Sequence, residues 1–162
     1  MKVLQPEDKH AKRASKPEPV VIWTLLTALG LTVAVIGWTD LSLIWIPPDF
    51  GNPSWEFGAI ATNFEALPLG TVGLALLSVG LLGRGNYKAV RIVAALFALI
   101  AVALLGVYVI YLLDVPLALR GVQDELRSAL KKGIAKTTLA AITYSTFYAW
   151  AAWYMLRSTR VR

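Results

Sequence analysis

The sequence predicts an all-α integral membrane protein with four transmembrane helices and short interfacial helices in the loops exported from the cytoplasm. Of its 162 residues, 57% are hydrophobic and 16% are charged, whereas soluble domains have about 45–50% and about 25%. Four stretches of 17 to 22 residues contain no charged side chain, and a membrane helix needs about 20 apolar residues. Most Lys and Arg residues lie in segments that would share one side of the membrane.

The chain begins with a basic segment, residues 1–19, which we expect to be a cytoplasmic tail. It combines five Lys or Arg and three acids with prolines, so it has too little apolar surface to fold alone. We expect it to be retained, because the apolar run after it is longer than the core of a signal peptide and no small-residue cleavage site follows Trp38. Lys12 and Arg13 are candidates for partner contacts.

Residues 20–38 form the first predicted transmembrane helix. These 19 uncharged residues span about 28 Å as a helix, close to the ~30 Å hydrocarbon core. Gly30, Ala34 and Gly37 fall on one helical face, which favours the close approach of a neighbouring helix. The alternative is that Gly and Ala are simply common in membrane helices.

The next segment, residues 39–66, is predicted to be an exported loop with four acids and no Lys or Arg. Asn52 or Ser54 is a suitable N-cap for a short helix that runs to about Glu65. We expect its apolar stripe to lie on the membrane surface or on a partner. The aromatic side chains are the candidate partner-binding residues, although a place in the interfacial belt is the alternative for each tryptophan: Trp45, Phe50, Trp55, Phe57 and Phe64.

Residues 67–83 form the second predicted transmembrane helix, with Pro68 in its first turn, where a missing N–H costs little. Residues 84–91 follow as a basic cytoplasmic turn, in which Gly85 and Asn86 are typical turn residues. Residues 92–113 form the third predicted transmembrane helix.

Residues 114–136 are predicted to form an exported amphipathic helix at the membrane interface. Charged side chains cover one face, and apolar residues near helical spacing form the other: Leu119, Val122, Leu126, Leu130 and Ile134. Residues 137–156 form the fourth predicted transmembrane helix, and residues 157–162 are a basic cytoplasmic end.

The distribution of basic residues predicts the topology. With four membrane helices, the two ends and the second loop share a side and contain 11 Lys or Arg, against five on the other side. The positive-inside rule therefore places both termini in the cytoplasm of a bacterial inner-membrane protein. The third loop departs from the rule, because all five opposing basic residues lie there.

Several classes of chemistry are disfavoured. There is no cysteine, and hence no disulfide or thiolate metal site. The predicted spans contain no charged residue or histidine, which argues against a proton relay. His10, the single histidine, lies in the tail. Motifs of hydrolases, kinases, dinucleotide-binding proteins and metalloproteases are missing. We expect neither an enzyme nor a nucleic-acid-binding protein.

Two groups of residues are candidate ligand sites. Asp49, Asn52 and Glu56 offer oxygens of the kind that Ca²⁺ binds, but their spacing matches no metal loop, and the alternative is a solvated rim. Aromatic side chains crowd the fourth predicted span and offer a surface for a pigment, carotenoid, quinone or lipid: Tyr144, Phe147, Tyr148, Trp150 and Trp153. Packing against lipid is the alternative, and we expect no intrinsic cofactor.

These features predict a non-catalytic accessory subunit of a multi-subunit membrane complex. We expect this complex to be bioenergetic, such as a photosynthetic reaction-centre or antenna assembly or a respiratory complex. Its partners would be other membrane subunits and lipids. One alternative is a small-molecule or lipid-handling membrane protein with residues 39–66 as a lid. Another is a sensor or assembly factor that acts transiently.

Overall fold

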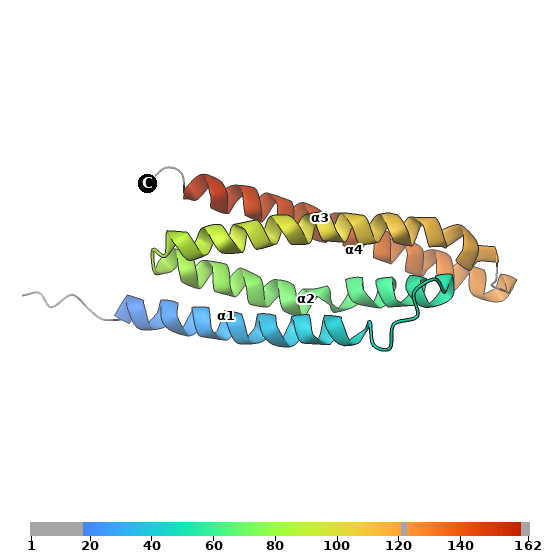
Figure 1. Ribbon diagram of the computed structural model, residues 1–162, viewed down its shortest axis with the longest axis horizontal. Coiled ribbons are helices and arrows are strands. Elements are labelled where there is room, and N and C mark those ends of the chain that lie inside the picture. Colours follow the sequence, from blue (N-terminus) through green and yellow to red (C-terminus); the bar gives the residue numbers. More distant parts are fainter. Residues whose placement is uncertain (1–17, 121–122, 160–162) are drawn as a thin grey trace, which may run out of the picture.

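The computed structural model describes residues 18–120 and 123–159, and this part of the chain contains four helices and no strand (Figure 1). They are α1 (Glu18–Leu43), α2 (Pro53–Gly83), α3 (Tyr87–Arg120) and α4 (Asp124–Ser158). The helices run alternately up and down along one long bundle. We call the end with residues 44–52 the loop end, and the end where α1 begins and α4 ends the terminal end. The predicted all-α class is confirmed.

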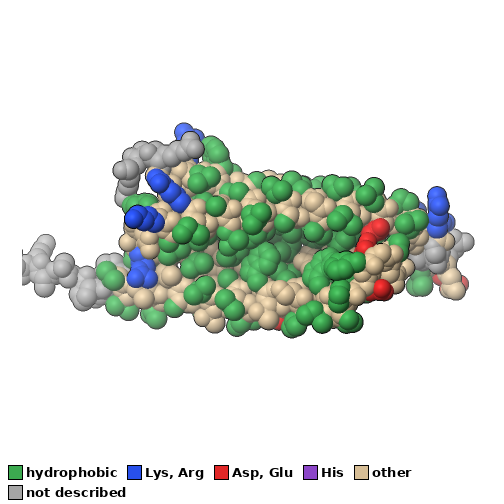
Figure 2. All heavy atoms as spheres, in the orientation of Figure 1, with side chains coloured by type: hydrophobic (Ala, Val, Ile, Leu, Met, Phe, Trp, Pro, Cys, Tyr) green, Lys and Arg blue, Asp and Glu red, His purple; other side chains and the backbone are tan. Residues whose placement is uncertain are grey.

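Three of the described helices, α1, α2 and α3, are long and apolar enough to cross a membrane. Large apolar side chains remain exposed along their outer faces, including Leu25, Val79 and Val102. Figure 2 shows hydrophobic side chains in green along the middle of the bundle, with Lys and Arg in blue toward its two ends. Such a surface suits contact with lipid, because apolar side chains cost free energy in water.

The helices are longer than the predicted spans, which corrects three expectations. Residues 39–43 continue α1 and residues 53–66 begin α2, so the connecting segment contains only residues 44–52. No separate interfacial helix lies between them, and Pro68 lies inside α2 instead of in its first turn. The charges of Asp40 and Glu65 end the apolar run, but a charge does not end a helix.

The same correction applies to the predicted amphipathic helix, residues 114–136. The helix α3 continues past Pro116 to Arg120, and α4 begins at Asp124, so two helices share this segment. The turn predicted over residues 84–91 is shorter in the structure, because α2 ends at Gly83 and α3 begins at Tyr87. Gly85 adopts φ +68°, a left-handed conformation that favours glycine.

Helix α1 packs closely against α2 through small residues. A Cβ atom at Gly37 would lie 2.7 Å from the Gly70 Cα, and one at Gly30 would lie 2.8 Å from the Leu77 Cα. Ala34 faces Gly73 across the same interface. The predicted small-residue face is therefore a real helix contact, of the kind that membrane helices use when their backbones approach closely.

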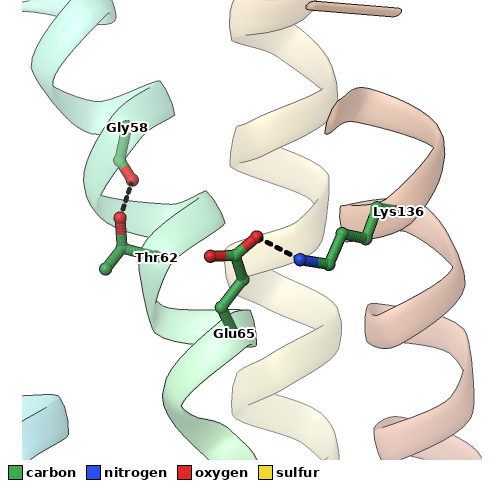
Figure 3. A network of polar contacts seen from close by, with 4 residues as sticks. All are labelled: Gly58, Thr62, Glu65 and Lys136. Carbon is green, nitrogen blue, oxygen red and sulfur yellow. Dashed lines mark hydrogen bonds and ion pairs between the residues drawn. The ribbon is translucent and has the colours of Figure 1, made fainter. Parts of the chain in front are cut away.

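The other three helices share an aromatic core. Phe97 of α3 lies edge-on to Tyr148 of α4, with ring centroids 5.0 Å apart. The Tyr148 hydroxyl shares a hydrogen bond of 2.8 Å with the Thr71 hydroxyl of α2. At the loop end, Lys136 of α4 donates to Glu65 of α2 at 2.7 Å, as Figure 3 shows. These contacts tie α4 to both α2 and α3.

Among the described helices, α1 packs against α2 alone, whereas α2 also packs against α3 and α4. Helices α1 and α3 therefore flank α2 without joining each other. The backbones of α1 and α3 therefore do not meet, and side chains line the space between these two helices.

Candidate functional site: an apolar groove between α1 and α3

A groove of about 370 Å³ lies between α1 and α3 near the loop end. Pockets that hold small molecules commonly measure about 300–1,000 Å³. In Figure 2, apolar side chains line the hollow between α3 and α1. Nine residues line the groove: Trp38 and Trp45 from α1 and the segment after it, Asn63 and Phe64 from α2, and Leu99, Ile100, Ala103, Leu104 and Val107 from α3.

The shape of the groove follows from residue sizes on α3. Leu99, Ala103 and Val107 follow one another at intervals of four residues and so lie in a row along the helix. The small side chain of Ala103 lies between two larger ones, which leaves a depression in that row. The row from Leu99 to Val107 extends about 12 Å along the helix axis, so the groove is long enough to hold part of a hydrocarbon chain.

Three aromatic side chains form the wall of the groove toward the loop end. Phe64 is 2% exposed and belongs to the buried core. Trp38 lies over Gly70, since a Cβ atom at Gly70 would be 3.1 Å from its Nε1 atom. Trp45 comes from the segment that joins α1 to α2. Flat rings at this position favour flat or elongated apolar ligands.

Apart from the indole N–H groups of Trp38 and Trp45, Asn63 supplies the only polar side-chain atoms among the residues that line the groove. It is half-buried, and no hydrogen bond joins its amide to the residues that the structure describes. An amide offers two N–H donors and a carbonyl acceptor. Asn63 is therefore the only groove residue suited to orient a polar group of a ligand by its side-chain amide.

Trp45 and Phe50 of segment 44–52 form a small aromatic cluster with Trp55 of the first turn of α2, and this cluster adjoins the groove through Trp45. Trp45 stacks with Phe50, with centroids 6.1 Å apart, and meets Trp55 edge-on at 5.7 Å. Phe50 and Trp55 are also edge-on, at 5.6 Å. Phe50 is 70% exposed. These three predicted partner-binding residues thus lie together, and Trp45 belongs to both the cluster and the groove.

The other predicted partner-binding residues do not join this cluster. Phe57 stacks on Tyr111 of α3 with centroids 4.8 Å apart, and Phe64 is buried. Lys12 and Arg13 lie outside the described residues.

The three candidate metal-binding residues make structural hydrogen bonds in the turn before α2. Asn52 Oδ1 accepts from the Ser54 and Trp55 backbone N–H groups and caps the helix. Asn52 Nδ2 donates to Asp49 Oδ2 at 2.7 Å, and the Gly51 N–H donates to Glu56 Oε1 at 2.7 Å. Within the described part of the chain, no group of three or more His, Asp or Glu residues is placed to hold a metal ion.

The structure divides the aromatic residues of α4 between the core and the surface. Tyr148 is fully buried, and Phe147 packs against Phe97 and Tyr148. Tyr144 is half-buried, whereas Trp150 and Trp153 are exposed. The five residues therefore do not form one ligand surface. Trp150 lines a second groove, of about 410 Å³, between α3 and α4.

Asp114 is a buried acid at the loop end of α3. Its Oδ2 atom makes no hydrogen bond within the described residues. From the sequence, Asp114 was only the residue that ends the third predicted span. Burial of an acid at this position depends on tertiary packing and has no signature in the local sequence.

Only Trp45 and Phe64 among the nine groove residues were candidates from the sequence. Two sequence signals could have pointed to the groove: the interval of four residues between Leu99, Ala103 and Val107, and the amide of Asn63 beside Phe64. Neither signal shows which helix lies opposite. Comparison of the chain with known protein families, curated proteins and solved structures gives no match.

Proposed function

We propose that this chain is a four-span bacterial inner-membrane protein that binds a lipophilic molecule of the bilayer in the groove between α1 and α3. The observation that carries the proposal is the groove itself: about 370 Å³, lined by eight apolar or aromatic residues and one amide, and placed along helices suited to a membrane. The lining contains no ionisable side chain, which favours binding over acid–base or nucleophilic catalysis.

Each of the four helices contains one of the uncharged stretches that were predicted as spans, and we call this stretch the charge-free window of the helix. The four windows support four spans. Residues 137–156 of α4 lie between Lys136 and Arg157, and Lys136 pairs with Glu65, which precedes the window of α2. At the terminal end, Arg91 donates to the Thr159 carbonyl oxygen at 3.0 Å, where the windows of α3 and α4 end together. The α4 window thus has the same height as its neighbours. The positive-inside rule then places the loop end outside and both termini in the cytoplasm.

The aromatic cluster of Trp45, Phe50 and Trp55 is the proposed cover of the groove. Trp45 links this cluster to the groove wall, so a displacement of residues 44–52 would open this end of the groove to the outside. This role corresponds to the lid of the lipid-handling alternative. It now concerns nine residues instead of the whole range 39–66.

A groove-filling variant tests the proposal. Ala103→Trp places a large side chain in the middle of the groove, whereas Ala98→Trp adds the same bulk to an exposed position of α3 outside it. Native mass spectrometry of protein purified in mild detergent would measure the retained lipophile. We expect retention by the parent chain and Ala98→Trp, and its loss from Ala103→Trp. Equal retention by both variants would refute the groove as the binding site.

A second candidate, an accessory subunit of a multi-subunit complex, is favoured by the groove between α3 and α4. Ala141, Ser145 and Ala149 form a small-residue stripe on α4. Ser145 is 5% exposed and lines this groove, yet its hydroxyl has no hydrogen-bond partner within the described residues. A membrane helix of another subunit that presents a polar side chain would fit this stripe.

Native gel electrophoresis with mass spectrometry tests the second candidate. Co-migration with a fixed set of larger membrane proteins, weakened by Ser145→Leu but not by Leu139→Phe at an exposed position of α4 outside this groove, would support a subunit role. Migration of the chain alone would contradict it. The identity of the co-migrating proteins would show whether the complex is bioenergetic.

A further inference from the structure

The polar end of the α1–α3 groove lies close to the outer limit of the charge-free windows. Asn63 precedes Glu65 by two residues, and Trp38 precedes Asp40 by two. The remaining groove residues on α3 extend away from this end toward the middle of the helix. A ligand with one polar end and an apolar tail would therefore place its polar end at Asn63 and its tail in the hydrocarbon region.

The charges around the groove argue against an anionic polar end. No Lys or Arg lines the groove. Lys136 pairs with Glu65, and the Asp40, Asp49 and Glu56 side chains add negative charge at the same end. A phosphate or carboxylate would approach these acids without a cation to bind it. The polar end of the ligand is then not an anion.

The walls of the groove specify the shape of that end. Trp38, Trp45 and Phe64 offer ring faces and edges on which a flat conjugated ring can pack. The Asn63 amide has free N–H donors for a carbonyl oxygen. We infer that the groove binds a lipophilic ring with carbonyl oxygens, of the quinone class, and that the Asn63 amide donates to a carbonyl oxygen of the ring. This inference rests on the proposed function, the binding of a membrane lipophile in the groove.

Three probes with similar tails test the inference: a decyl-substituted benzoquinone, decylbenzene and dodecyl phosphate. Each is titrated against the full chain in mild detergent, and the shift of the unfolding temperature gives its affinity, because a ligand that binds the folded state stabilises it. We expect the quinone to bind about 3- to 10-fold more tightly than decylbenzene, the range of one neutral hydrogen bond. Dodecyl phosphate should bind least.

Two variants separate the role of the amide from that of the groove. Asn63→Leu keeps a side chain of similar size without the amide, and we expect it to bind the quinone and decylbenzene equally. Thr62→Val removes a polar group one residue away, on an exposed side of α2 where the hydroxyl donates to the Gly58 carbonyl oxygen at 2.9 Å (Figure 3). This control should keep the preference for the quinone. An unchanged unfolding temperature of Asn63→Leu without ligand would show that it is folded.

The outcomes distinguish the two proposals. Equal binding of the quinone and decylbenzene by the parent chain, or an unchanged preference in Asn63→Leu, would overturn the carbonyl inference and leave the groove as a lipophile site. Tightest binding of dodecyl phosphate would also overturn it. Binding of none of the probes, together with no lipophile in the purified protein, would refute the proposed function itself.

Discussion

A single added methyl group at Gly37 should loosen α1 from the bundle. The Cβ atom of Gly37→Ala would lie 2.7 Å from the Gly70 Cα and 2.9 Å from the Leu69 carbonyl carbon. Carbon atoms pack best at about 3.5–4.0 Å, so the two helices must separate by about 1 Å. The atoms on α2 belong to the backbone and cannot turn aside as a side chain would. A gap of this size forfeits about a quarter to a half of the dispersion attraction across the interface.

The matched control is Gly106→Ala on α3. A Cβ atom there meets nothing within 4 Å. Both variants gain about 0.8–1.0 kcal/mol of helix propensity, so this term cancels when they are compared. The remaining difference is the cost of overpacking, about 1–3 kcal/mol. It corresponds to about a 5- to 150-fold change in the ratio of docked to undocked α1.

Thiol labelling measures this ratio directly. The chain has no native cysteine, and Leu41 is 3% exposed on α1, one turn beyond Gly37. In a Leu41→Cys background, the labelling rate reports how often α1 leaves its site, since a buried thiol is protected. Gly37→Ala should be labelled about 5- to 150-fold faster than Gly106→Ala. Equal labelling rates of Gly37→Ala and Gly106→Ala would refute the close contact between α1 and α2. They would also refute the separation of α1 from α3 that depends on this contact.

Three further predictions follow from single contacts. Tyr148→Phe removes the hydrogen bond to Thr71 and should cost about 0.6–1.7 kcal/mol in thermal unfolding; the exposed Tyr154→Phe should cost nothing, and equal effects would contradict the role of the bond. Asn52→Ala removes the cap of α2 and should cost about 0.5–2 kcal/mol, seen as faster hydrogen exchange in the first turn; unchanged exchange there would exclude the cap. Ser54→Cys, on the exposed loop end, should react with an impermeant reagent in intact cells, and reaction only after lysis would reverse the proposed topology.

The sequence predicted the features that depend on one helix at a time. The charge-free windows predicted where apolar helices lie, and the face shared by Gly30, Ala34 and Gly37 predicted a close contact. Both signals are local, because hydropathy and small side chains act at fixed spacing along one helix. The helix ends were wrong for a related reason. Asp40 and Glu65 limit the apolar window, but the backbone hydrogen bonds of α1 and α2 continue past them.

The candidate site could not be predicted in the same way, because it depends on which helices are neighbours. Phe147 and Tyr148 satisfy a pattern of aromatic crowding, yet packing turns them toward the core. Asn63 follows no motif, and its importance comes from the α3 residues across the groove. Asp49 and Asn52 contain oxygen atoms of the kind that bind metals, but the Asn52 side-chain oxygen accepts hydrogen bonds from the first turn of α2 instead. The residue types therefore indicate candidates, and the contacts in the folded chain decide which of them can form a site.

The small-residue face and the groove both follow from the close packing of α1 against α2. Gly37, Gly70 and Gly73 let α1 approach α2 so closely that α1 has no packing contact with α3. A bundle with larger residues at these positions would hold α1 farther from α2, and α3 could then move into the space. Trp38 would lose its place over Gly70, and with it the aromatic wall of the groove. The Gly37→Ala variant should therefore weaken ligand binding as well as the docking of α1, whereas Asn63→Leu should change ligand preference and leave α1 docked. A chain in which Gly37→Ala loosens α1 but keeps full affinity for the ligand would place the binding site elsewhere.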